Sequence, residues 1–205
     1  MGQGIATSYL QIFSEQLQIP VNQLKVVQGD TDLVEGHGSV GSRSLFVGGN
    51  AILRGIEDFL EECKQLAASE LEASVEDLEY HQGDFQVKGT RVGIGIFDLC
   101  SRQSGNSISV KRKKELTGRS WPNGCHVAEV EIDAETGEVR LDRYVSVDDV
   151  GNTVNPMIVH GQVQGGIASG LGQAVLERTE YDASGQLLSG SYMDCLLYTS
   201  PSPRD

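Results

Sequence analysis

Three polar clusters framed by glycine carry the residue types that could bind a ligand. Gln3 stands between Gly2 and Gly4 where a helix is predicted to start. Gln162 lies near the start of a later helix, where the first N–H groups have no partner within the helix. Between them in the chain, the loop 35–49 combines glycines, serines and an arginine. Its N–H and hydroxyl donors suit a phosphate or another anionic ligand.

Each cluster also has a plainer interpretation. The loop 35–49 could equally be a flexible surface loop, and it is not a Walker loop because no Gly-Lys-Ser/Thr follows. In the stretch 150–177, glycines recur every three or four residues beside an apolar helical stripe. Close packing of this helix against another element explains most of these glycines. It explains the polar Gln162 less well.

The first half of the chain predicts helices that alternate with short strands. Glycine, proline or turn residues bound each of these segments. The predicted segments are a helix over 5–17, a strand over 24–27, a long helix over 51–71, strands over 78–81 and 85–87, and a helix over 96–101. In the long helix, an apolar stripe that includes Ile56, Cys63 and Ala67 predicts the buried side.

The second half changes to the period-two alternation of a β-hairpin, over 127–145. A glycine-rich helix is expected from Pro156, and a further hairpin over 179–189. The acids Asp148 and Asp149 follow the first hairpin, and they are more typical of turn formers than of a functional pair.

These elements predict the α+β class, with two layers of helices on small mixed sheets. Their order allows two similar halves, about 1–105 and 106–194.

Length and charge exclude several classes of protein. A chain of 205 residues can bury a core, and its formal net charge of −13 argues against a nucleic-acid partner. The basic run 111–114 is short enough to be a solvated strand end. No apolar stretch approaches transmembrane length, and no signal peptide opens the sequence. The scattered cysteines lack CxxC spacing, so we expect reduced thiols in a cytoplasmic protein without a zinc or iron–sulfur site.

Six motifs in a fixed order carry a family resemblance. They are MGQG, GDTD, GSVGSRS with GGNA, EVEID with TGEV, DDVGNTVNPMIVHGQVQGG with GLGQAVLE, and YD with GQLLSGSYMD. Each motif is weak alone, but the order and spacing of all six are specific. Over residues 1–194 the chain resembles the molybdopterin-binding domain of the molybdenum hydroxylase large subunit. That family includes xanthine dehydrogenase, aldehyde oxidase and aerobic carbon monoxide dehydrogenase.

The resemblance implies which residues would hold a molybdenum–molybdopterin cofactor. Gln3, between Gly2 and Gly4, would contact the pterin, and Gln162 would reach the cofactor from the glycine-rich helix. The loop residues that would support the pterin and its pyrophosphate are Ser39, Val40, Gly41, Ser42 and Ser44. A glutamine amide both donates and accepts, which suits the alternating edge of a pterin. We expect the three turns to face one shared surface and no protein side chain to ligate the metal.

The resemblance also implies a reaction and partners. The reaction would be oxidative hydroxylation of an aldehyde or N-heterocycle, or oxidation of carbon monoxide. Electrons would pass to iron–sulfur and FAD subunits or domains, in an assembly such as a homodimer of heterotrimers. The family's catalytic glutamate lies in a KGxGE-like motif that this chain lacks, so no catalytic residue is expected here. The sequence leaves open the substrate and whether the cofactor is the cytosine dinucleotide form of many bacterial relatives.

Both ends of the sequence indicate a fragment. The resemblance places a substrate-binding region before Met1 and the base motif after Asp194, so Met1 would be an internal methionine. Residues 195–205 can be encoded, residue for residue, by a transposase-library sequencing adaptor, and we expect them not to be biological. The isolated fragment would then be a poor enzyme. The alternative from another class is a cofactor-free α+β binding or scaffold module.

Overall fold

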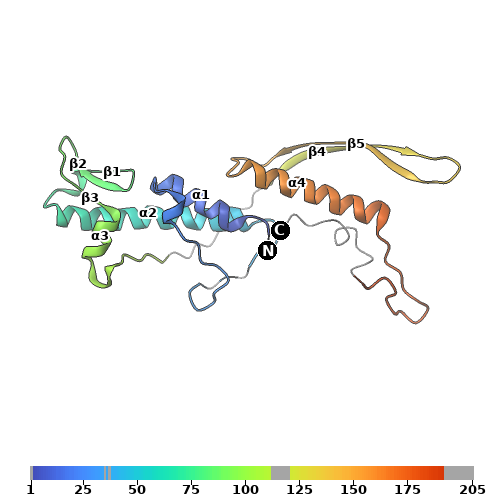
Figure 1. The fold of residues 1–205 in the computed structure, drawn as a ribbon, viewed down its shortest axis with the longest axis horizontal. Helices are drawn as coiled ribbons and strands as arrows, with labels where there is room; N and C mark the ends of the chain where they lie inside the picture. Colours follow the sequence, from blue (N-terminus) through green and yellow to red (C-terminus); the bar gives the residue numbers. More distant parts are fainter. Residues whose placement is uncertain (1, 35, 37, 112–120, 192–205) are drawn as a thin grey trace. The chain divides into compact units, whose positions relative to one another are not determined.

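The computed structural model describes residues 2–34, 36, 38–111 and 121–191. The adaptor-like segment 195–205 and most of the basic run 111–114 lie outside the described residues. The chain divides into two compact units, Met1–Ser120 and Trp121–Asp205, which are described separately below (Figure 1).

Helices and small sheets confirm the α+β class. Mixed sheets were expected, but the strand pairs among the described residues are antiparallel. The proposed similarity of 1–105 to 106–194 stays a prediction. None of the described helices is long and apolar enough to span a membrane.

The first helix confirms its prediction closely. Helix α1 runs over Ile5–Leu17 and ends at Gln18, whose backbone is left-handed (φ 51°) and whose N–H donates to the Ser14 carbonyl. The 3-10 turn η1 follows at Val21–Gln23. The strand predicted over 24–27 is wrong: Leu24 has an extended backbone, but no neighbouring strand among the described residues pairs with this segment.

The long helix begins earlier than its sequence predicts. Helix α2 runs over Ser44–Glu70, so the second part of the predicted loop 35–49 is helical. Gly48 and Gly49 weaken a local helix signal, but here they face α1, and packing decides the conformation. The predicted apolar stripe does form the buried side of α2.

A small antiparallel sheet follows α2 in the order β1-β2-β3. Its strands are β1 Leu78–His81, β2 Asp84–Val87 and β3 Gly93–Gly95. The 3-10 turn η2 (Val75–Asp77) precedes them, and helix α3 (Ile96–Arg102) and the 3-10 turn η3 (Ser104–Asn106) follow. The β1–β2 turn places Gln82 and Gly83 in the left-handed region (φ 50° and 91°), as a tight two-residue hairpin turn requires. The strands 78–81 and 85–87 and the helix 96–101 are thereby confirmed within a residue or two at their ends.

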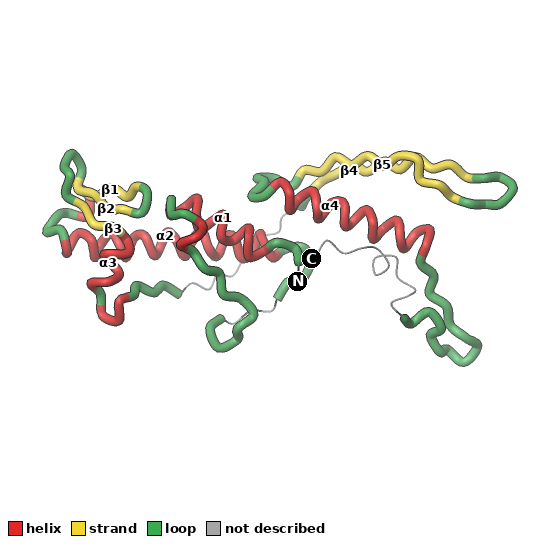
Figure 2. The backbone as a smooth tube through the Cα atoms, in the orientation of Figure 1, coloured by secondary structure: helices red, strands yellow, loops and turns green. Residues whose placement is uncertain are grey.

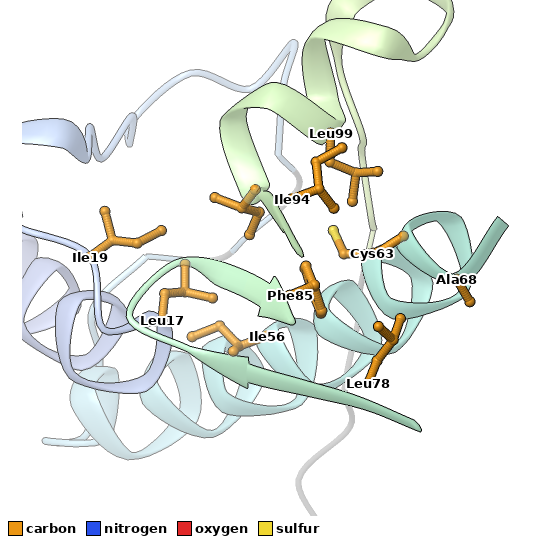
Figure 3. Packing of buried hydrophobic residues seen from close by; sticks show 11 residues of the cluster. Leu17, Ile19, Ile56, Cys63, Ala68, Leu78, Phe85, Ile94 and Leu99 are labelled. Atoms are coloured by element: carbon orange, nitrogen blue, oxygen red, sulfur yellow. The ribbon is translucent and has the colours of Figure 1, made fainter. Parts of the chain in front are cut away.

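The core of the first unit lies between this sheet, α3 and one side of α2 (Figure 3). Its fully buried side chains include Phe85 of β2, Leu99 of α3 and Cys63 of α2. Tyr80 packs its ring on Phe85 at a centroid distance of 4.9 Å and donates its hydroxyl to the Leu17 carbonyl at 2.6 Å. The core therefore also fixes the end of α1.

The second unit contains a long hairpin and the glycine-rich helix (Figure 2). Strand β4 (Asn123–Ile132) pairs with β5 (Val139–Asp149), and the register shifts after Glu129. The Asp133 carboxylate accepts from two N–H groups of the connecting turn, which lowers its pKa. Helix α4 (Pro156–Leu171) continues into a π-helical turn η4 (Gly172–Leu176), and the predicted hairpin over 179–189 is reduced to a single bridge between Tyr181 and Leu187.

Many large apolar side chains of the second unit are exposed. All the fully buried hydrophobic side chains among the described residues belong to the first unit. On the hairpin, strand alternation puts Val127 and Val145 on one face and Val130 and Ile132 on the other, and all four are exposed. Both faces of this hairpin are thus apolar in part.

Helix α3 allows a matched test of the core. Leu99→Ala should destabilise the first unit by about 2–5 kcal/mol, because it removes a side chain with 0 % exposure. Phe97→Ala, on the same helix but 56 % exposed, is the control and should change little. Amide hydrogen exchange of peptides from β1 to α3 measures both. Equal acceleration in the two variants would contradict this core.

The buried thiol gives a second test, by pH. Burial raises the pKa of Cys63 to about 12. The thiol therefore stabilises the folded unit below the unfolded thiol pKa of about 8.5, and this contribution is lost as pH rises toward 12. At pH 8, iodoacetamide should modify exposed Cys125 and spare Cys63 until urea unfolds the protein. Mass spectrometry of the alkylated peptides checks this, and rapid labelling of Cys63 in the folded protein would contradict it.

Candidate ligand-binding site

The start of α1 leaves backbone donors available. Gly2 and Gly4 both adopt left-handed backbone angles (φ 71°), a region that favours glycine. Gly4 is the N-cap of α1, and its carbonyl accepts from the backbone N–H and the hydroxyl of Ser8 at 3.0 and 3.1 Å. No side chain caps this helix. The N–H groups of its first turn are therefore free of the usual capping oxygen.

The start of α2 has the same property. Its N-cap is Arg43, and no side chain caps the helix. The loop before it bends through left-handed angles at Gly38, Gly41 and Ser42 (φ 69°, 60° and 51°). A left-handed conformation at a residue other than glycine, such as Ser42, costs roughly 1–2 kcal/mol. Such turns orient successive N–H groups toward one point, as anion-binding loops do.

Three predicted site residues meet between these two helix starts. The Gln3 amide donates from Nε2 to Ser39 Oγ at 3.1 Å, and the Ser44 hydroxyl donates to the same oxygen at 2.7 Å. Ser39 Oγ thus accepts twice, which leaves its own hydroxyl hydrogen for another acceptor. The Gln3 Oε1 meets no donor among the described residues. The cluster therefore offers a donor and an acceptor beside two uncapped helix starts.

The other predicted site residues lie in two places. Val40, Gly41 and Ser42 follow Ser39 in the same exposed loop. Gln162 belongs to the second unit, where it is exposed on α4. The Asn155 side chain caps that helix by accepting from the Ile158 N–H at 3.0 Å. A surface shared by Gln162 and the cluster of the first unit stays a prediction.

The glycines of α4 do not support close packing within the described residues. A Cβ built on Gly161, Gly165, Gly166 or Gly170 would meet no atom within 4 Å, and α4 buries no residue fully. The plainer interpretation of these glycines predicted a neighbour in contact with them. The described residues do not supply one.

One side-chain network was missed from the sequence. On the hairpin, His126 lies between Tyr144 and Asp148, with Nδ1 2.9 Å from the tyrosine hydroxyl and Nε2 3.0 Å from the carboxylate. Gly124 makes room for it, because a Cβ there would lie 2.6 Å from Asp148 Oδ1. The register shift after Glu129 lies between the predicted turn and His126, so the turn alone does not predict that these residues share a face. Asp149 does form a turn, by accepting from the Gly151 N–H at 2.9 Å.

The fold defines an α+β domain in which the polar cluster of Gln3, Ser39 and Ser44 joins the starts of two helices that no side chain caps. The family model of the molybdopterin cofactor-binding domain matches residues 1–202. The chain belongs to this family, as the six motifs indicated.

Characterised relatives and solved structures agree with this assignment. The chain is 33% identical to the carbon monoxide dehydrogenase large chain of Hydrogenophaga pseudoflava, covering 97% of this chain and 26% of that one. It is 32% identical to subunit gamma of the 6-hydroxypseudooxynicotine dehydrogenase complex of Paenarthrobacter nicotinovorans, over 96% of this chain and 26% of that subunit. The chain therefore spans about a quarter of the length of these curated relatives.

Two enzymes of known structure share the fold. The structure of CO dehydrogenase from Oligotropha carboxidovorans matches with a TM-score of 0.82 at 30% identity, over 98% of this chain and 26% of that one. Quinoline 2-oxidoreductase from Pseudomonas putida 86 matches with a TM-score of 0.77 at 32% identity, over 98% and 27% of the two chains.

The His126 network can be tested through Gly124. Gly124→Ala should push Asp148 away from His126, because the added Cβ overlaps the carboxylate and nearly touches the Val147 carbonyl. Such overpacking costs about 1–3 kcal/mol, so amides at the end of β5 should exchange roughly five- to a hundredfold faster. Ser146→Ala, directly opposite His126 in the register, is the control and should exchange as wild type does. Unchanged exchange in Gly124→Ala would show that the network does not hold this end of the hairpin.

Proposed function

We propose that this chain is the molybdopterin-binding part of the catalytic large subunit of a molybdenum hydroxylase. The observation that carries the proposal is the cluster of Gln3, Ser39 and Ser44 between two uncapped helix starts. Membership of the cofactor-binding family adds the identity of the ligand. Gly2, Gly4, Val40, Gly41 and Ser42 complete the first binding segment, and Gln162 contributes from α4.

The residues present fit the chemistry of this cofactor. The Gln3 Oε1 can accept from a pterin N–H, while the Ser39 hydroxyl can donate to a ring nitrogen or carbonyl. The positive end of the α2 dipole and its free N–H groups suit the phosphate of the cofactor's tail. When bound, the cofactor supplies the two-electron oxidation chemistry, while these residues bind and orient it.

The substrate and partners follow from the same proposal. The relatives are named for carbon monoxide, 6-hydroxypseudooxynicotine and quinoline. We propose a small substrate of this range: an aldehyde, an N-heterocycle or carbon monoxide. The electrons would pass to iron–sulfur and FAD partners in the cytoplasm, in an assembly such as a dimer of heterotrimers. The catalytic base would come from a part of the subunit outside this chain.

The proposal is tested by cofactor content. The complete protein, expressed from its full gene in a bacterium that makes the molybdenum cofactor, should contain about one molybdenum and one pterin per subunit. Gln3→Ala and Ser39→Ala should each lower retention of both, by roughly five- to a hundredfold in affinity, because each leaves polar groups of the site unpaired (about 1–3 kcal/mol).

The matched control is Gln23→Ala, an exposed glutamine in η1 that should leave the content unchanged. Molybdenum is measured by plasma mass spectrometry and the pterin by fluorescence of its oxidised form. A complete, folded wild-type protein with neither component would instead support the cofactor-free binding or scaffold module.

A further inference from the structure

Helices α1 and α2 cross where Tyr9 lies on Gly48. The Tyr9 hydroxyl donates to the Ser44 carbonyl at 3.1 Å. A Cβ built on Gly48 would lie 1.8 Å from the Tyr9 hydroxyl oxygen and 2.5 Å from the ring carbon that bears it. Any side chain at this position would therefore displace the phenol. Gly48 is the residue that allows a tyrosine of one helix to reach the backbone of the other.

The acceptor of this hydrogen bond is the first carbonyl of α2. In an α-helix, the Ser44 carbonyl also accepts from the Gly48 N–H, and a carbonyl oxygen has lone pairs for both donors. Tyr9 thus bonds to the first turn of α2 itself. Half-burial raises the pKa of the Tyr9 phenol, so it remains a protonated donor at physiological pH.

The same two helices meet a second time through side chains. Gln3, just before α1, donates to Ser39, and Ser44, the first residue of α2, donates to the same hydroxyl oxygen. Ser44 is therefore held twice: by its hydroxyl through Ser39, and by its carbonyl through Tyr9. The Tyr9 contact comes directly from α1, and the hydroxyl contact reaches Gln3 through Ser39. The spacing between the two helix starts is fixed at two points.

We propose that Tyr9 is a positioning residue for the cofactor site, and that its hydroxyl, with the space left by Gly48, sets the spacing between Gln3 and the start of α2. This inference rests on the proposed function, because the ligand is the cofactor proposed there. Tyr9 would influence the ligand indirectly, since its hydroxyl is bonded to the backbone of Ser44. It acts through the Ser44 carbonyl, and a displacement of about 1 Å at a binding cluster is enough to weaken it strongly.

A matched pair of tyrosines isolates this role. Tyr9→Phe removes only the hydroxyl at the crossing. Tyr80→Phe removes the same group from the same kind of bond, to the Leu17 carbonyl, at the other end of α1. Both variants are made in the complete protein. Peptide-level hydrogen exchange and loss of molybdenum and pterin during dialysis are the two measurements.

Tyr9→Phe should accelerate exchange in residues 38–48 and speed cofactor loss about five- to tenfold, while β1–β3 exchange as in wild type. Tyr80→Phe should accelerate exchange in β1–β3 and leave cofactor loss unchanged. Gly48→Ala should act like Tyr9→Phe, with a larger effect. If Tyr9→Phe leaves exchange in 38–48 unchanged, or if both Phe variants lose cofactor equally, the positioning role is overturned.

Failure of the proposed function gives a different result. A wild-type protein without molybdenum and pterin would overturn the cofactor assignment and with it the role of Tyr9 toward that ligand. Faster exchange in residues 38–48 of Tyr9→Phe would then still show that the phenol fixes the two helix starts. The two outcomes are therefore distinguishable in one set of samples.

Discussion

The packing of one side of α2 constrains the rest of the first unit. The middle and the end of α2 pack into the core, where Cys63 lies among the side chains of the sheet and α3. Its start lies in the ligand-binding cluster. Because a helix is stiff over this length, burial of the apolar side also fixes the direction in which the Ser44 end points. The same core includes Leu17 at the end of α1, so one apolar cluster packs against both helices of the site.

Sequence patterns predicted correctly those helices and strands whose periodicity or boundary residues lie within the element itself. The stripe of α1, the two-strand alternation on either side of Asp133 and the Pro156 helix start are of this kind. The start of α2 was predicted too late because glycine at position 48 is typical of a loop. Its place in the helix is explained only by the contact with Tyr9, which the sequence does not reveal. The strand at 24–27 failed for the opposite reason, since its extended backbone has no partner among the described residues.

The candidate site shows a similar division. Gln3, Ser39 and Ser44 were chosen because the motif order resembles a family, and the structure brings these three side chains together. From residue types alone, the loop 35–49 could equally be a flexible surface loop. The His126 network was missed because it depends on the cross-strand register, and the register shift after Glu129 cannot be read from the two strands and their turn. Sequence order identified the family, and tertiary contacts identified how its residues are held.

The hairpin of the second unit has a consequence for handling the protein. Within the part of the chain that the structure describes, no third strand pairs with either edge of this ribbon, and both of its faces carry exposed valine or isoleucine. Unpaired N–H and carbonyl groups along such edges recruit strands from other molecules, and apolar faces stack on one another. Expression of residues 121–191 by themselves would therefore favour insoluble intermolecular sheets, so biochemical work on α4 is best done in the complete polypeptide.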